Sequence, residues 1–136
     1  MQIEANSSVP IFRQIVDGLA AAVAAGVYAP GELVPSVRQQ ATNLLVNPNT
    51  VQRAYEHLER EGLLVSRRGS GMGVTSDAPV IAQRRMSEGI RSTFVQGIEA
   101  GKSAKLSKDA IDGLYKTAWN GNGTNRDATS RDGGKR

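Results

Sequence analysis

Apolar residues recur at every fourth position near the start of the chain, a spacing that places them on one face of an α-helix. They are Ile11, Ile15, Leu19 and Val23, with Phe12 and Val16 beside them. Pro10 suits the first turn of such a helix, and Gly26 suits the position just beyond its end. We therefore predict an amphipathic helix between these two residues.

Two further helical patterns follow. Ser36 and Gln39 have the spacing of a capping box, which marks the start of a second helix. The inner face of this helix is predicted to hold Val37, Ala41 and Leu44. Asn47 can cap a third helix, Pro48 suits its first position, and Gly62 suits its end. The buried stripe of the third helix is predicted to hold Val51, Ala54, Tyr55 and Leu58.

Short strand patterns accompany these helices. Residues 33–34 are compatible with a very short strand, and residues 63–65 with a longer one. The sequence RRGSG at residues 67–71 is typical of a hairpin tip, and residues 72–75 would form the return strand. Three helices followed by a hairpin are the order of a winged helix-turn-helix, with the hairpin as the wing. The predicted fold class is mainly α with a small β-hairpin.

A boundary is predicted at residues 77–79, after which two more helical patterns carry large apolar residues. They are Met86, Ile90, Phe94, Ile98, Ile111, Leu114 and Tyr115. A longer helix and a short one cannot bury all of these residues between them, so we expect a homodimer whose partner subunit completes the core. The expected organisation is a winged-helix DNA-binding domain over 1–77, a two-helix dimerisation region over 78–119 and a disordered tail over 120–136, where polar residues dominate.

Composition narrows the class of protein. The 136 residues include no cysteine, which excludes disulfides and cysteine-based zinc sites. No apolar run is long enough to cross a membrane, and no signal peptide is recognisable, so a cytoplasmic protein is expected. The net charge is +4, but residues 1–76 hold six arginines and six acids, so the excess lies beyond them. Any argument for a nucleic-acid partner must therefore rest on local placement.

The start of the third helix carries side chains of the kinds that read base edges or hold phosphates. They are Asn47, Asn49, Thr50, Gln52 and Arg53. Acidic residues come only later, at Glu56, Glu59 and Glu61. A recognition helix contacts DNA through its N-terminal residues. The absence of acidic residues from the start of this helix is compatible with such a contact. The alternative is that Asn47 merely caps the helix and that the other side chains form a solvated face.

Two other segments add basic groups. Arg38 lies early on the second helix, where a helix crossing the DNA backbone needs a phosphate anchor; a solvated arginine is the alternative. The predicted hairpin tip offers Arg67, Arg68, Gly69, Ser70 and Gly71. Alternating glycines also occur in phosphate-binding loops, but those loops open a helix and this one does not. His57 is the only histidine, and no catalytic, metal or cofactor constellation is found, so we expect no enzyme.

These residues resemble the GntR family of bacterial transcriptional regulators. LVPSVRQQAT resembles the second-helix motif of the family, and VNPNTVQRAYEHLEREGLL followed by RRGSG resembles the recognition helix and wing of its YtrA subgroup. The resemblance implies double-stranded DNA as the partner. It also implies DNA contacts at Arg38, Asn49, Thr50, Arg53, Arg68, Gly69 and Gly71. Members of the subgroup are typically dimeric repressors, often of transporter operons.

Three positions differ from the family pattern. Leu45 stands where glycine is common in the turn before the recognition helix, and a left-handed conformation there would cost a non-glycine residue ~1–2 kcal/mol. Gln40 stands where the second helix would accept an aliphatic residue, so its amide must reach solvent or a partner. Residues 72–73 replace a Thr-Phe pair, which predicts a weaker outgoing wing strand.

Two functions from different classes remain open. The first is a dimeric, sequence-specific DNA-binding repressor that recognises a palindromic operator. The second is a winged-helix module that binds an acidic protein surface without reading DNA sequence. The base-reading chemistry of the third helix favours the first. A small-molecule effector remains possible at a dimer interface, although the accessory region is too small for an obvious ligand domain.

Overall fold

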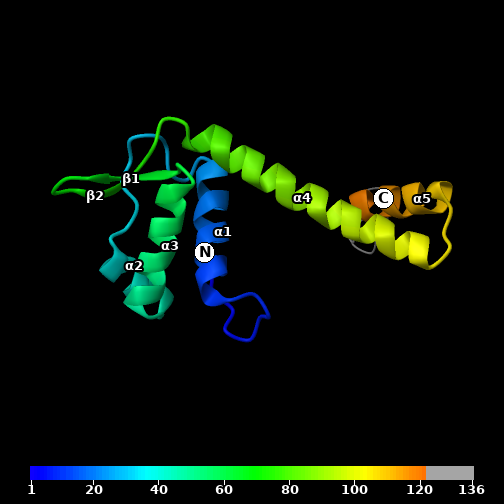
Figure 1. Ribbon diagram of the computed structural model, residues 1–136, viewed down its shortest axis with the longest axis horizontal. Helices are drawn as coiled ribbons and strands as arrows, with labels where there is room; N and C mark the ends of the chain where they lie inside the picture. Colours follow the sequence, from blue (N-terminus) through cyan, green and yellow to red (C-terminus); the bar gives the residue numbers. More distant parts are fainter. Residues whose placement is uncertain (122–136) are drawn as a thin grey trace, which may run out of the picture. The chain divides into compact units, whose positions relative to one another are not determined.

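The computed structural model describes residues 1–121, and the tail predicted to be disordered lies almost entirely outside them. Figure 1 shows the order of the elements. They are α1 (Ile11–Ala24), α2 (Val37–Leu44), α3 (Pro48–Arg60), β1 (Leu64–Arg67), β2 (Gly71–Val74), α4 (Ala78–Ser103) and α5 (Lys108–Asn120). The chain divides into two compact units, the first over Met1–Gly89 and the second beginning at Ile90. The predicted fold class, mainly α with one hairpin in winged-helix order, is confirmed.

The core of the first unit lies between α1, α3 and the hairpin. The predicted apolar face of α1 is buried from Ile15 onward and partly buried at Ile11 and Phe12, and the whole predicted stripe of α3 is buried. The largest fully buried side chains are Tyr55, Ile15, Leu19, Leu58, Leu63, Val16, Val51 and Val74. Burying one such aliphatic side chain contributes about 1.5–3 kcal/mol. This small aliphatic core therefore fixes the orientation of α3, the helix that carries most of the candidate DNA-binding residues.

Local caps set the ends of the two helices in the helix-turn-helix. The Ser36 hydroxyl accepts a hydrogen bond from the Gln39 backbone N–H at 3.1 Å, which is one of the two bonds of the predicted capping box. The Asn47 side chain accepts one from the Asn49 N–H at 2.7 Å, and a proline occupies the first turn of α3. Between the helices, Leu45 adopts the left-handed conformation, with φ 57° and ψ 47°. The turn thus keeps the geometry for which glycine is suited, with leucine in its place.

The hairpin pairs over the full length of both strands. The register runs from Leu64 opposite Val74 to Arg67 opposite Gly71. The return strand lies within one residue of its predicted limits, whereas the first strand extends two residues beyond the predicted end at residue 65. The short strand predicted at residues 33–34 is a single bridge between Leu33 and Gly73. The Val34 N–H also donates to the Met72 carbonyl at 3.0 Å. Despite its unusual Met-Gly sequence, the outgoing strand is therefore paired on both sides.

The first turns of α4 belong to the first unit. Ala78 and Ala82 are fully buried, and Ile81 packs against the same core. The Arg85 guanidinium donates to Asp17 of α1 at 2.8 Å and to Glu61, just after α3, at 3.0 Å. The helix starts within residues 77–79, where the boundary is predicted, and the compact units divide after Gly89. Small alanines four residues apart let α4 approach the core closely, so its first turns pack with the first unit.

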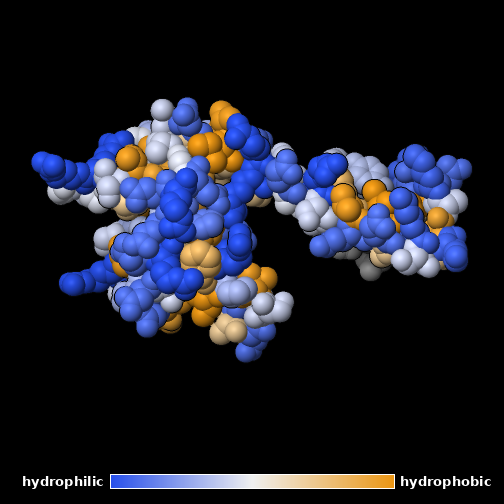
Figure 2. Space-filling model, viewed as in Figure 1, coloured by the Kyte–Doolittle hydropathy of each residue, from blue (hydrophilic) through white to orange (hydrophobic). Residues whose placement is uncertain are grey.

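The second unit pairs the end of α4 with α5, which Figure 1 shows alongside it. Lys105 takes a left-handed conformation in the connecting turn, and the Ser107 hydroxyl caps α5 by accepting from the Ala110 N–H at 3.1 Å. A Cβ added to Gly101 would lie 2.8 Å from Ile111, so the glycine permits close helix packing. Despite this contact, most large apolar side chains of the unit are exposed, and Figure 2 shows them as an apolar patch.

Candidate nucleic-acid interface

The N-terminal part of α3 presents polar side chains to solvent. Asn49, Gln52 and Arg53 are exposed, and Thr50 is half-buried. Asn47 is exposed too, but its side-chain oxygen is already used as the helix cap. The first turn of α3 contains no acidic residue. The positive end of the helix dipole is therefore not neutralised by a carboxylate of its own first turn.

Gln52 and Arg53 are consecutive, yet the structure places their side chains against different neighbours. The Gln52 amide donates to the Glu56 carboxylate at 3.0 Å, one helical turn further along α3. The Arg53 guanidinium lies over the ring of Phe12 on α1, 4.7 Å from the ring centroid. Gln52 thus faces the groove beside the hairpin, and Arg53 faces α1.

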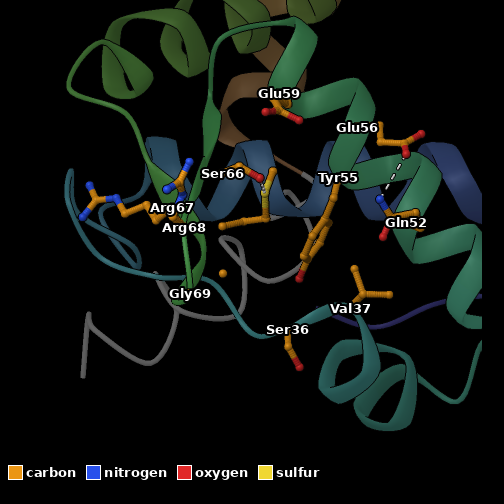
Figure 3. A pocket seen from close by; sticks show the side chains of 12 residues that line it. Ser36, Val37, Gln52, Tyr55, Glu56, Glu59, Ser66, Arg67, Arg68 and Gly69 are labelled. Carbon is orange, nitrogen blue, oxygen red and sulfur yellow. Dashed lines mark hydrogen bonds between the residues drawn. The ribbon is translucent and has the colours of Figure 1, made fainter.

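A groove of about 400 Å³ separates α3 from the hairpin, and Figure 3 shows the side chains that line it. The α3 side contributes Gln52, Tyr55, Glu56 and Glu59. The hairpin side contributes Ser66, Arg67, Arg68, Gly69, Gly71 and Met72, and the start of α2 contributes Ser36 and Val37. Carboxylates and guanidinium groups therefore line the same groove, without an ion pair between them among residues 1–121.

Tyr55 anchors this groove to the rest of the first unit. Its hydroxyl donates to the Pro35 carbonyl at 2.6 Å, which ties α3 to the segment that leads into α2. Burial raises the pKa of Tyr55 well above its ordinary value, and the nearby Tyr28 adds to the rise. The hydroxyl therefore remains a neutral donor under physiological conditions. This bond holds the two helices of the helix-turn-helix at a fixed separation.

The basic residues of the hairpin differ in their surroundings. The Arg67 side chain lies across the bare Cα of Gly73, where an added Cβ would come within 2.6 Å of its Nε. Arg68, Gly69 and Ser70 form the exposed tip, and Gly69 has a φ of 75°, which glycine adopts without strain. The unusual Gly73 therefore has a structural reason, because a larger residue would displace the arginine.

Arg38 stands apart from these groups. It is the second residue of α2, it is exposed, and it makes no ion pair with any residue among 1–121. The structure thus groups Gln52 with Arg67, Arg68, Gly69 and Gly71 around one groove, and it leaves Arg38 on α2.

Two residues that contact this surface were missed by the sequence analysis. Glu56 was noted only as an acid, although its spacing from Gln52 is that of a helical hydrogen-bonding pair. Phe12 was placed only beside the apolar face of α1. Its contact with Arg53 joins two separate helices, and no local sequence pattern signals it.

Comparison with known proteins places this geometry in a family. Residues 12–74 match the model of the bacterial regulatory proteins of the gntR family. The HTH-type transcriptional repressor YtrA of Bacillus subtilis is 36% identical over 115 residues, which cover 85% of this chain and 79% of YtrA. The uncharacterized HTH-type transcriptional regulator YhcF of B. subtilis is 38% identical over 81 residues, which cover 60% of this chain and 67% of YhcF.

Solved structures agree with the sequence relatives. A GntR family transcriptional regulator from Listeria monocytogenes superposes with a TM-score of 0.71 and 31% identity, covering 82% of this chain and 97% of that one. YtrA from Sulfolobus acidocaldarius, a GntR-family transcription factor, gives a TM-score of 0.54 at 30% identity, covering 87% of this chain and 95% of that one. No helix among residues 1–121 is both long and apolar enough to cross a membrane. The chain belongs to the GntR family and is a DNA-binding transcriptional regulator.

Proposed function

We propose that this protein is a dimeric repressor that recognises a palindromic operator through the start of α3 and the tip of the hairpin. The observation that carries the proposal is the set of exposed amide and guanidinium groups at the start of α3, with the half-buried Thr50 among them, beside a basic hairpin tip. Such groups supply the donors and acceptors that distinguish base pairs in the major groove. The helix that holds them is fixed by a buried stripe and by the Tyr55 hydrogen bond.

The candidate residues divide into three roles. On α3, Asn49, Thr50, Gln52 and Arg53 contact base edges or the phosphates beside them, and Asn47 supports them as the helix cap. Arg38 on α2 contacts phosphate only, because its helix crosses the backbone. The hairpin tip and the strand residues beside it follow the adjacent DNA backbone or minor groove; they are Arg67, Arg68, Gly69, Ser70 and Gly71.

The homodimer part of the proposal rests on the second unit. A groove of about 390 Å³ there is lined mainly by apolar side chains from α4 and α5, including Phe94, Ile98, Ile111, Leu114 and Tyr115. Phe94 and Leu114 are each more than half exposed, which is costly for such residues in an isolated chain. Met86 and Ile90, further back on α4, are also exposed. A second copy would cover these residues, and two-fold symmetry would present two recognition helices to a palindrome.

The resemblance to the YtrA subgroup extends the proposal to an operon for a membrane transporter and to action in the cytoplasm, where bacterial DNA lies. A small-molecule effector would bind most readily in the apolar groove of the second unit, where it could alter the dimer.

One observation favours a second candidate function. Glu56 and Glu59 lie in the same groove as Arg67 and Arg68, and a surface of mixed charge also suits a protein partner. Under that alternative, the winged helix would bind protein without reading DNA sequence.

Selection of bound sites from random DNA separates the two functions. The proposed function predicts an enriched, palindromic site, together with an affinity for nonspecific DNA that falls steeply with salt. The spacing of the two half-sites would report how the recognition helices are arranged in the dimer. Failure to enrich any sequence, combined with weak retention on heparin, would favour the protein-binding alternative.

A further inference from the structure

The contact between Arg53 and Phe12 has a specific geometry. Arg53 projects from α3, and its guanidinium lies over the ring of Phe12 on α1, 4.7 Å from the ring centroid. This is the distance at which a cation is attracted to the face of an aromatic ring. The guanidinium makes no ion pair with any residue among 1–121, so no carboxylate in this part of the chain occupies its donors.

The ring that supports Arg53 is itself held in place. Phe12 is partly buried and packs against the core of the first unit. Its ring also meets the ring of His57 edge-on, with 5.6 Å between the centroids. His57 contacts Glu61, which in turn accepts a hydrogen bond from Arg85 on α4. Phe12 is therefore a fixed surface and not a mobile side chain that happens to lie nearby.

A contact with an aromatic ring differs from an ion pair in how many of the arginine N–H donors it leaves available. A guanidinium is planar, and its N–H donors all point outward in that plane. A carboxylate partner would consume two of those donors, whereas an aromatic face consumes none. With its guanidinium over the ring and no carboxylate partner among residues 1–121, Arg53 keeps donors for a guanine or a phosphate, and the ring limits the orientations that the guanidinium can take.

We propose that Phe12 is a positioning residue for sequence recognition, which holds the Arg53 guanidinium in the orientation that reads the operator. The inference rests on the proposed function, in which Arg53 contacts a base edge. It adds a residue of α1 to a recognition surface otherwise assigned to α2, α3 and the hairpin. Phe12 does not itself contact DNA in this proposal.

The test uses the full-length protein with a selected operator and with random DNA. Phe12→Leu keeps an apolar side chain against the core but removes the ring face, whereas Phe12→Tyr keeps the face. We expect Phe12→Leu to weaken operator binding by about 2–5-fold, the worth of one exposed cation–π contact, and to leave random-DNA binding nearly unchanged. Phe12→Tyr should retain the affinity of the parent protein. Phe12→Leu should weaken the base preference at one position of the operator, and this should be the same position at which Arg53→Ala weakens it.

A double-substitution cycle separates positioning from general destabilisation. If Phe12 acts through Arg53, adding Phe12→Leu to Arg53→Ala should produce no further loss. The proposal would be overturned if Phe12→Leu reduced operator affinity equally in the parent protein and in Arg53→Ala. It would also be overturned if Phe12→Leu weakened binding to the operator and to random DNA equally. The Arg53 side-chain proton shifts in the free protein should change in Phe12→Leu but not in Phe12→Tyr, and unchanged shifts in both would also overturn it.

The same experiments distinguish failure of this inference from failure of the proposed function. If Arg53→Ala leaves DNA binding unchanged, the role of Arg53 is wrong and the positioning proposal falls with it. Asn49→Ala and Gln52→Ala then test whether the rest of α3 reads DNA. If all three alanine variants bind the operator like the parent protein, the proposed function of the whole surface fails.

Discussion

Gln40 is the one polar residue among the buried positions of residues 1–121, with 5% of its surface exposed. Its side chain makes no hydrogen bond to another residue in this part of the chain. Every fully buried side-chain nitrogen or oxygen atom among these residues has a hydrogen-bond partner, so the Gln40 amide must be in contact with solvent. The solvent reaches the amide through a hollow of about 610 Å³, which Gln40 lines together with Gly18, Tyr28 and Leu44. The requirement stated from sequence, that this amide reach solvent or a partner, is met by solvent.

This position offers a test of stability. Gln40→Leu should raise the free energy of unfolding by about 1 kcal/mol, because an apolar side chain replaces an amide that is poorly solvated where it lies. Denaturant unfolding would measure the change. Gln39→Leu is the matched control, since Gln39 is the neighbouring residue on α2 but is exposed, and it should change stability little. A destabilised Gln40→Leu variant would show that the amide has a structural role.

Tyr55 predicts a specific response to alkaline pH. Because burial raises its pKa above the ordinary value of 10.0, the folded protein keeps the proton after the unfolded chain has lost it. The contribution of Tyr55 to stability is therefore complete below pH 10 and declines above it, by up to about 1.4 kcal/mol per pH unit. Unfolding at a series of pH values up to 11.5 would show this slope.

The control for the pH response is Tyr55→Phe. This variant should lose about 0.5–1.5 kcal/mol at neutral pH, because the hydrogen bond to Pro35 is absent, and should show a shallower decline above pH 10. If the free energy of unfolding of both proteins declines in parallel above pH 10, Tyr55 is not the group responsible for the decline.

Among the elements, those with local signals were predicted well. The starts of α2 and α3 follow from Ser36 and Asn47, whose side chains make the expected caps. The hairpin follows from its glycines. These features depend on residues only a few positions apart, and so the sequence displays them directly.

The features that were missed depend on distant residues. Nothing local to Ala78 and Ala82 reveals that they are buried against the core, because alanine is equally common on exposed helix faces. Arg85 bonds to Asp17, which is 68 positions away in the chain. The contacts between Arg67 and Gly73 and between Arg53 and Phe12 likewise required the assembled fold. The types of the candidate residues could be predicted, but their partners could not.

The two helices of the helix-turn-helix are expected to divide their tasks. Arg38→Ala on α2 should weaken binding to the operator and to random DNA by similar factors, and should lower the salt slope by about one unit, because a phosphate contact is lost. Arg53→Ala on α3 should weaken operator binding by about 1–3 kcal/mol more than random-DNA binding, because a base contact is lost. Titrations of both variants on both DNAs at several salt concentrations would measure these effects. The reverse pattern would mean that the two roles have been exchanged.

For the whole molecule, the division between the two compact units after Gly89 indicates where the chain should be truncated to obtain a stable first unit. Residues 1–89 should form a folded monomer that binds the operator weakly, because linked half-sites gain from effective concentration and a single unit does not. Residues 1–77 should be less stable by about 2–4 kcal/mol, since they lack the buried start of α4 and the ion pairs of Arg85. Sedimentation and thermal unfolding of both fragments beside the full chain would test this. A full-length monomer would contradict the dimer.

The separate neighbours of Gln52 and Arg53 have a consequence for how related regulators acquire new operators. The Gln52 side chain bonds to Glu56 beside the hairpin, and the Arg53 side chain contacts Phe12 on α1, so these two side chains share no partner. The absence of a shared partner removes one source of energetic coupling between substitutions at the two positions. Under the proposed function, a duplicated gene could therefore change the base read by one side chain while keeping the base read by the other. Operator preference in this lineage would then diverge one position at a time, through intermediates that still bind DNA.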